Sequence, residues 1–200
     1  RKKGQQMDNF QYIGIAILAV FYGAYFIKML GQRKKGIKTT QFGKGNKLKK
    51  TIVTEKSLQA VSILVVAAEA CSIFQGSGAA LPGWLRALGL ALAAFGTLVF
   101  LAAMHTMQDS WRAGIPEKET TALVTEGIFK ISRNPAFLGF DSVYIGLCLC
   151  FFQGGLLAIS LLGALLLDLQ IREEEQFLQQ AFGEEYLSYR KKVGRYFLWF

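Results

Sequence analysis

Long apolar runs separated by short polar segments dominate this sequence. A run of about 20 apolar residues predicts a membrane-spanning helix, because a helix satisfies its own backbone hydrogen bonds where the bilayer offers none. Three such runs stand alone, at residues 10–30, 57–74 and 84–104. The third also carries the small residues Gly89, Ala93 and Gly96, which predict close packing against another helix.

A longer apolar stretch, Ala136 to Leu169, predicts a helical hairpin. Gln153-Gly154-Gly155 interrupts it with the composition of a tight turn, which leaves helices over residues 136–152 and 155–169. Because each is only about 15 to 18 residues long, two full spans and a buried hairpin that does not fully cross both stay open. The predicted fold is an all-α polytopic membrane protein of about five transmembrane helices, forming a single domain over residues 1–200.

Beyond the last apolar run the chain predicts a cytoplasmic C-terminal amphipathic helical segment, interrupted at Gly183. Asp168 and Arg172 lie four residues apart, a spacing at which side chains pair on one helix face. Glu173 is expected on the solvated face. Glu174 leans toward the packed side, so we expect a cation or a hydroxyl group as its partner.

Composition and charge fit a membrane protein with a defined orientation. Hydrophobic residues make up 52% of the chain and charged residues 18%, against about 25% charged in typical soluble proteins. The connecting segments are alternately basic and neutral, and 19 of the 23 Lys and Arg residues fall on one side. This asymmetry predicts an external N-terminus and a cytoplasmic C-terminus, with the basic segments touching anionic lipids. Only Phe42 interleaves with the basic residues of the first loop, so nucleic acid is not an expected partner. No metal site is expected either, because the three cysteines lie in apolar runs without a nearby His.

The segment Arg133-Asn134-Pro135 marks the predicted start of the fourth span. Proline is favoured at the first position of a helix. A helix N-terminus next to an arginine is an anion site by its own geometry. Asn134 fits an ordinary helix cap equally well, and the spacing alone leaves these two interpretations equal.

Two spaced motifs resemble one enzyme superfamily. The first runs from Glu126 to Gly139, and the second joins Glu173-Glu174-Glu175 to Phe182-Gly183-Glu184-Glu185-Tyr186. Together they resemble the isoprenylcysteine carboxyl methyltransferase and phospholipid methyltransferase superfamily, in which the motifs usually read G-I-Y-x-x-x-R-H-P-x-Y-x-G and a Glu pair ahead of F-G-x-E-Y. The resemblance covers roughly the last half of the chain. It implies an integral membrane enzyme that binds S-adenosylmethionine between its last spans and its cytoplasmic C-terminal segment.

The resemblance also implies which residues form the site. It puts the cofactor-binding part at about residues 104–200 and assigns S-adenosylmethionine binding to Gly127, Phe129, Arg133, Asn134, Pro135, Phe137, Glu174 and Glu175. Asn134 replaces the usual His, and Phe129 and Phe137 replace Tyr, so contacts of that imidazole and those hydroxyls are in doubt here. The residue types suit the donor, because a sulfonium compound with a carboxylate, ribose and adenine needs anions, a cation and aromatic walls.

The expected reaction is methyl transfer to a lipophilic acceptor at the cytoplasmic membrane interface, most like carboxyl O-methylation of a prenylated cysteine or a related lipid. Such a displacement chiefly needs donor and acceptor to be aligned. Arg172 is a candidate catalytic residue that orients an acceptor carboxylate. His105, the only histidine, is a second candidate catalytic residue. The alternative interpretation is that it lies at the membrane interface at the end of a span. Carboxylate, amine and thiol acceptors and the oligomeric state stay open, because lipophilic substrates leave no short motif.

Two other functions compete with methyl transfer. NADPH-dependent sterol-type membrane reductases carry R-H-P-N-Y-x-G followed by an acid, whereas this chain lacks the Asn-Tyr pair and has Asp141 one position further on. A noncatalytic membrane module or transporter subunit is supported only by Glu69, a lone acid in the second span. Titration with S-adenosylhomocysteine and with NADP separates the three functions.

Overall fold

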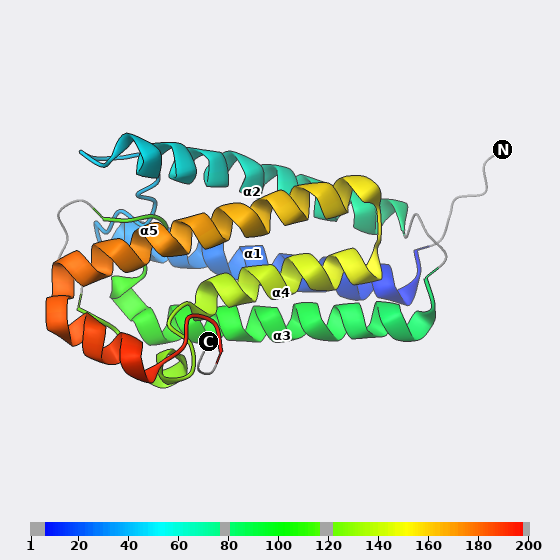
Figure 1. Cartoon of the computed structure of the whole chain (residues 1–200). Helices are drawn as coiled ribbons and strands as arrows, with labels where there is room; N and C mark the ends of the chain where they lie inside the picture. The colour runs from blue at the N-terminus through cyan, green and yellow to red at the C-terminus, as the bar shows by residue number, and fades with distance from the viewer. Residues whose placement is uncertain (1–6, 77–80, 117–121, 198–200) are drawn as a thin grey trace.

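The predicted spans are helices in the computed structural model, which describes residues 7–76, 81–116 and 122–197 (Figure 1). The long helices are α1 (Asn9–Lys34), α2 (Lys49–Gln75), α3 (Gly83–Met107), α4 (Pro135–Cys150) and α5 (Gly154–Lys192). Two short 3-10 turns, η1 (Gln108–Ser110) and η2 (Gly127–Lys130), lie between α3 and α4. The described part of the chain contains no strand beyond an isolated bridge between Thr40 and Ala113, and the all-α prediction is confirmed.

Four of these helices, α1, α2, α3 and α5, are long and apolar enough to cross a bilayer. The chain is therefore an integral membrane protein. At 16 residues α4 is shorter, about 24 Å at 1.5 Å per residue, so its complete crossing stays a prediction. Local sequence fixes several ends: a capping box between Asp8 and Gln11 begins α1, and Pro135 is the first residue of α4.

The predicted hairpin is present, with α4 ending at Cys150 and α5 beginning at Gly154 after the N-cap residue Gln153. The amphipathic segment is a continuation of α5, which runs for 39 residues. The interruption at Gly183 is confirmed as a kink, with φ of 50° and ψ of −125°, a conformation that glycine adopts without steric cost. The end of α5 consequently folds back toward the start of α4 (Figure 1).

Small residues let α3 and α4 pack closely, as the sequence predicts. A Cβ atom on Gly146 would lie 2.5 Å from the carbonyl oxygen of Gly89 and 2.6 Å from the backbone nitrogen of Ala93. Gly96 meets Gly139 in the same way, with a Cβ on Gly96 falling 2.7 Å from the facing carbonyl oxygen. The two backbones therefore touch along the helices and hold the start of α4 against the end of α3.

Replacement of Gly146 by alanine is expected to lower stability by about 1–3 kcal/mol, because the new methyl group must push the two backbones apart. Thermal unfolding in detergent measures the effect. Gly155→Ala is the matched control, since a Cβ there meets no atom within 4 Å. Equal melting temperatures for the two variants would contradict the close packing of α3 and α4.

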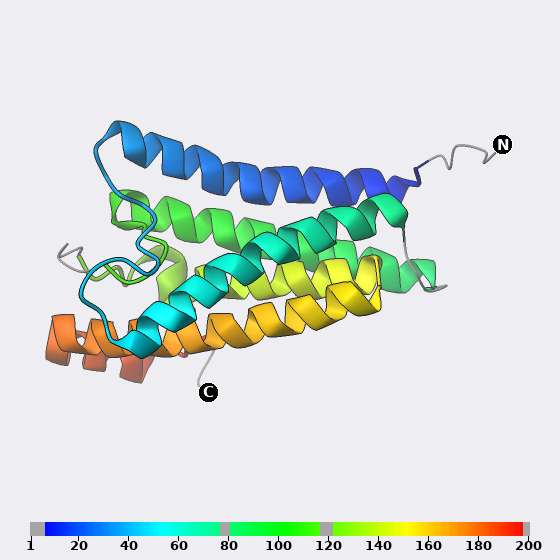
Figure 2. The same ribbon diagram turned by 90° about the horizontal axis from the view of Figure 1, so that it is seen from above.

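Several of the segments outside the long helices gather at one end of the bundle, hereafter the loop end. The segment between α1 and α2, the segments between α3 and α4, and the chain after α5 all lie there (Figures 1 and 2). In Figure 2, α1 and α2 lie close together near the N-terminus and diverge toward the loop end. This end carries the basic segments that predict the cytoplasmic side. Arg1, Lys2, Lys3 and Lys118, which also enter that prediction, lie outside the described residues.

Candidate functional site

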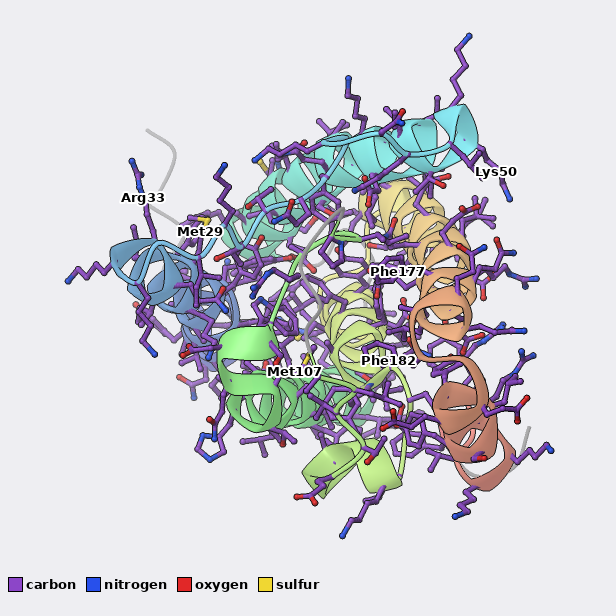
Figure 3. All side chains as sticks on the ribbon, turned by 90° about the vertical axis from the view of Figure 1, so that its left-hand side faces the viewer. Met29, Arg33, Lys50, Met107, Phe177 and Phe182 are labelled. Carbon is purple, nitrogen blue, oxygen red and sulfur yellow. The ribbon has the colours of Figure 1, made fainter. Side chains whose placement is uncertain are left out.

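A cavity of about 440 Å³ lies at the loop end of the bundle. This volume is within the range of small-molecule sites. Its walls come from α1, α2, α4, α5 and the connecting segments. Figure 3 looks at this end: Met29 of α1 and Met107 of α3 lie on one side, and Phe177 of α5 lies on the other. The cavity therefore extends across the bundle from α1 and α3 to α5.

The wall formed by α4, α5 and the residues just before α4, hereafter the polar wall, carries the polar side chains of Arg133, Asn134, Gln170 and Glu174 among apolar ones. Gln170 donates from Nε2 to Oε1 of Glu174 at 2.9 Å. Gln170 is fully buried, and its Oε1 has no hydrogen-bond partner among the described residues. The buried Nε of Arg133 likewise has none within the described part of the chain. Two residues of the cavity lining thus each keep a buried polar atom unpaired, which a polar ligand can satisfy.

Glu174 is the carboxylate of this wall. It lies beyond Asp168, where the apolar part of α5 has ended. The pKa of Glu174 is raised to about 7, mainly by burial and also by the charge of Glu55, while the hydrogen bond from Gln170 opposes the rise. A carboxyl group with a pKa near neutrality changes charge in the ordinary working range of pH, so its ligand binding is expected to be pH-dependent.

The residues after α5 form a strap, residues 193–197, that runs beside the start of α4. The carbonyl oxygen of Gly194 accepts from the backbone N–H of Arg133 at 3.0 Å, and that of Arg195 accepts from the N–H of Asn134 at 3.1 Å. The side chain of Asn134 makes no capping bond to α4 and instead donates to the Arg195 carbonyl at 3.2 Å. Asn134 therefore fastens the strap and does not cap the helix.

A buried ion-pair network fixes the strap and the arginine of the polar wall. Glu175 accepts from Nη2 of Arg133 at 2.8 Å and from Nη2 of Arg195 at 2.7 Å. Burial alone raises the pKa of Glu175, but hydrogen bonds from Arg195 and the charge of Arg133 outweigh it and hold that pKa below its usual value. The Arg133 guanidinium also donates to the carbonyls of Arg190 and Val193, which leaves Nε as its one unpaired nitrogen.

The expectation that Glu173 is solvated is wrong. Its side chain is 6% exposed, accepts from Nζ of Lys50 at 2.8 Å and accepts from the hydroxyl of Thr51 at 2.7 Å. The reason is tertiary: α2 packs along α5, so the face of α5 that flanks its apolar stripe is covered by a second helix. Glu173 thus joins the start of α2 to α5.

Glu55, a fully buried carboxylate on α2, holds together two loop segments that line the cavity, and these segments are called the roof of the cavity. Its oxygens accept from Nζ of Lys47 at 2.7 Å, from the backbone N–H of Gly43 at 2.7 Å and from that of Ile115 at 2.9 Å. These bonds join the segment before α2 to the segment after α3. Phe42 and Gly114, from those two segments, both line the cavity.

Comparison with known proteins assigns the chain to a family. The family model described as Phospholipid methyltransferase matches residues 84–185, just over half of the chain. The chain belongs to the phospholipid methyltransferase family. The match takes in α3, α4, most of α5 and the polar wall, whereas α1 and α2 lie before it.

Curated relatives carry a more specific name. The protein-S-isoprenylcysteine O-methyltransferase of Mus musculus is 33% identical over 114 residues, which cover 55% of this chain and 40% of that protein. The protein of the same name from Saccharomyces cerevisiae is 34% identical over 111 residues, covering 54% and 46%. Protein-S-isoprenylcysteine O-methyltransferase A of Arabidopsis thaliana is 30% identical over 115 residues, covering 56% and 58%. The chain thus spans between 40% and 58% of the length of these relatives.

Most residues that the family motifs single out converge on the cavity. Those that line it are Phe129, Arg133, Asn134, Pro135, Phe137 and Glu174. They come from η2, the start of α4 and α5, and the strap and the Glu175 network hold these elements together. The structure therefore joins the two sequence motifs into one wall.

Four residues of the sequence prediction lie outside the cavity lining. Glu175 is in the ion-pair network, and Gly127 begins η2 with a φ of 57° against the side chain of Thr106. The Arg172 side chain is 58% exposed and donates to Asp168 at 2.7 Å, which confirms the predicted pair. His105 is exposed at the end of α3. The catalytic roles of Arg172 and His105 stay predictions.

Sequence reasoning assigned no site role to Glu55, Trp111 or Gln170, all of which are buried. Trp111 and Gln170 line the cavity, and Glu55 is bonded to the loop segments that line it. Glu55 had a readable signal: with Thr51, Thr54 and Leu58 it forms a buried stripe at helical spacing on α2. The basic charges around it were interpreted only as an orientation signal. Gln170 had no comparable signal, because its importance depends on which loops and helices surround it.

Proposed function

We propose that this protein transfers a methyl group from S-adenosylmethionine to a lipophilic acceptor at the cytoplasmic membrane interface, and that the acceptor is the carboxylate of a prenylated cysteine. One observation carries the proposal: a single cavity joins a charged and amide-rich wall to a wall of apolar side chains on helices that face lipid. Family membership supports the methyl transfer, and the printed names of the relatives support the acceptor.

The polar wall fits the methyl donor in chemistry. Glu174 and the unpaired Oε1 of Gln170 can accept from the donor's ammonium group or its ribose hydroxyls. The unpaired Nε of Arg133 can donate to its carboxylate. Phe129 and Phe137 provide aromatic faces for the adenine or the sulfonium. Each of these residues lies within the part of the chain that matches the family.

The opposite wall fits an acceptor that arrives from the bilayer. Phe26 on α1 and Ile63 on α2 both line the cavity, although their side chains are 53% and 66% exposed on the outside of the bundle. The cavity lining thus reaches exposed apolar surface on both α1 and α2. A lipid tail can therefore stay among apolar side chains while the reactive group reaches the polar wall.

Methyl transfer to a carboxylate requires chiefly that the protein align the methyl donor with the acceptor. When bound, S-adenosylmethionine supplies a methyl group on a positively charged sulfur. A carboxylate oxygen attacks that methyl carbon, the carbon–sulfur bond breaks and its electron pair stays on sulfur, so no proton is transferred. The residues of the cavity then need only hold the two reactants in line and exclude water.

The asymmetric distribution of Lys and Arg residues supports an orientation in which the cavity faces the cytoplasm. The basic segments and the cavity share one end of the bundle, so the cavity end is expected to face the cytoplasm. A cytoplasmic cavity has direct access to a charged, water-soluble donor.

Two measurements on detergent-purified protein test the function. Calorimetric titration is expected to show binding of S-adenosylhomocysteine and none of NADP. Incubation with methyl-labelled S-adenosylmethionine and S-farnesylated N-acetylcysteine is expected to yield the labelled methyl ester. Binding of NADP alone would support a reductase, and binding of neither compound would refute both enzyme functions.

A further inference from the structure

Trp111 places an unpaired hydrogen-bond donor in the lining of the cavity. Its side chain is 6% exposed, and its indole Nε1 has no partner among the described residues. A buried N–H group without an acceptor costs free energy, so such groups in native proteins usually meet a ligand or an ordered water. An unpaired indole N–H in a residue of the cavity lining can donate to an oxygen atom of a bound molecule.

The position of Trp111 is fixed on two sides. Its ring packs edge-to-face against Phe100 with 5.6 Å between ring centroids. Its carbonyl oxygen accepts from Nε2 of Gln32 on α1 at 3.0 Å, and Oε1 of Gln32 in turn accepts from the hydroxyl of Thr39 at 2.6 Å. A donor held in this way is already oriented before a ligand binds, and so loses little entropy on binding.

Trp111 belongs to the wall opposite the polar wall. It follows η1, the 3-10 turn after α3, and its carbonyl oxygen is hydrogen-bonded to Gln32 of α1, whereas Gln170 and Glu174 lie on α5. Figure 3 shows the corresponding separation, with Met29 and Met107 on one side and Phe177 on the other. The methyl donor is proposed to occupy the α4 and α5 wall. The unpaired indole is thus on the side from which an acceptor enters between α1 and α2.

The neighbour of Trp111 adds positive charge to this wall. Arg112 also lines the cavity, and its Nη1 donates to the carbonyl oxygens of Asp109 at 2.7 Å and of Trp111 at 2.8 Å. These bonds hold the Arg112 guanidinium at the backbone of Trp111. An N–H donor next to a cation is complementary to a carboxylate and less so to a neutral thiol or a protonated amine.

We propose that the Trp111 indole N–H donates a hydrogen bond to the acceptor's carboxylate and, with the charge of Arg112 beside it, positions that carboxylate for methyl transfer. The inference rests on the proposed function and names its acceptor subsite. One carboxylate oxygen is held by the indole while the other attacks the methyl carbon. The new carbon–oxygen bond forms as the carbon–sulfur bond breaks toward sulfur, and the carboxylate's charge is neutralised without a proton.

Trp111→Phe tests the subsite, because it removes the N–H and keeps an aromatic ring. With S-farnesylated N-acetylcysteine as acceptor, kcat/KM is expected to fall about 10- to 100-fold, the loss for one hydrogen bond to a charged group. The Kd for S-adenosylhomocysteine is expected to change less than about twofold. The melting temperature is expected to fall slightly, because phenylalanine fills less of this buried site than tryptophan does. Trp84→Phe is the matched control, because Trp84 is 70% exposed and lies outside the cavity lining.

Three outcomes would overturn the inference. A kcat/KM close to that of the Trp84→Phe control means that the N–H does not contact the acceptor. A parallel loss of S-adenosylhomocysteine affinity assigns the indole to the methyl donor. A loss of kcat/KM no larger than the loss of folded protein at the assay temperature assigns it a structural role. Failure of the proposed function itself looks different, because the unsubstituted protein then neither binds S-adenosylhomocysteine nor methylates the acceptor.

Discussion

Replacement of Glu175 by alanine is expected to lower the free energy of unfolding by about 3–5 kcal/mol, the loss typical when one partner of a buried ion pair is removed. The Arg133 side chain is only 9% exposed, so its charge stays buried without its carboxylate. Arg195 loses the same partner, and the strap loses its strongest attachment. For a chain of this length the melting temperature is expected to fall by roughly 6–20 °C.

The matched control for Glu175→Ala is Glu184→Ala, which removes an exposed acid from the same helix. This control is expected to change the free energy of unfolding very little. Because the pKa of Glu175 is lowered, its ion pairs stabilise the fold fully above the ordinary glutamate pKa of about 4.3 and are lost as the pH falls through the lowered value. This acid-sensitive part of the stability should be missing in Glu175→Ala. A melting temperature equal to that of Glu184→Ala would contradict the network.

Replacement of Glu174 by glutamine is expected to weaken S-adenosylhomocysteine binding by about 10- to 100-fold, while stability changes little. Glu174 contacts Gln170 and the cavity and takes no part in the Glu175 network, so its charge is available to a ligand. Isothermal titration calorimetry measures the affinity. Glu184→Gln, the same substitution on an exposed face of the helix, is expected to bind like the unsubstituted protein.

The pH dependence makes the Glu174 test sharper. With a pKa of about 7, the carboxyl group is largely neutral one unit below that value and largely charged one unit above it. Affinity for a ligand carrying an ammonium group is therefore expected to rise with pH across this interval. Glu174→Gln should show no such rise. An unchanged affinity and an unchanged pH profile in Glu174→Gln would exclude Glu174 from the donor site.

These two adjacent glutamates show what a sequence motif can and cannot distinguish. The resemblance assigns both Glu174 and Glu175 to cofactor binding. In the structure Glu174 lines the cavity, whereas Glu175 points into the contact between the strap and α4. Successive positions on a helix differ in direction by about 100°, so adjacent residues rarely share one environment. Which of them faces the cavity depends on how α4 and the strap pack against α5.

The sequence by itself determined the helices, the hairpin turn, the kink at Gly183, the small-residue packing of α3 and the family to which the chain belongs. Those features follow from local properties: apolar length, the conformational freedom of glycine, and residues close together in the chain. Only the tertiary structure decided that Glu173 is buried, that Glu55 holds the cavity roof and that Trp111 presents an unpaired donor. Each of these depends on contacts between residues far apart in sequence, and burial and hydrogen-bond pairing are properties of such contacts.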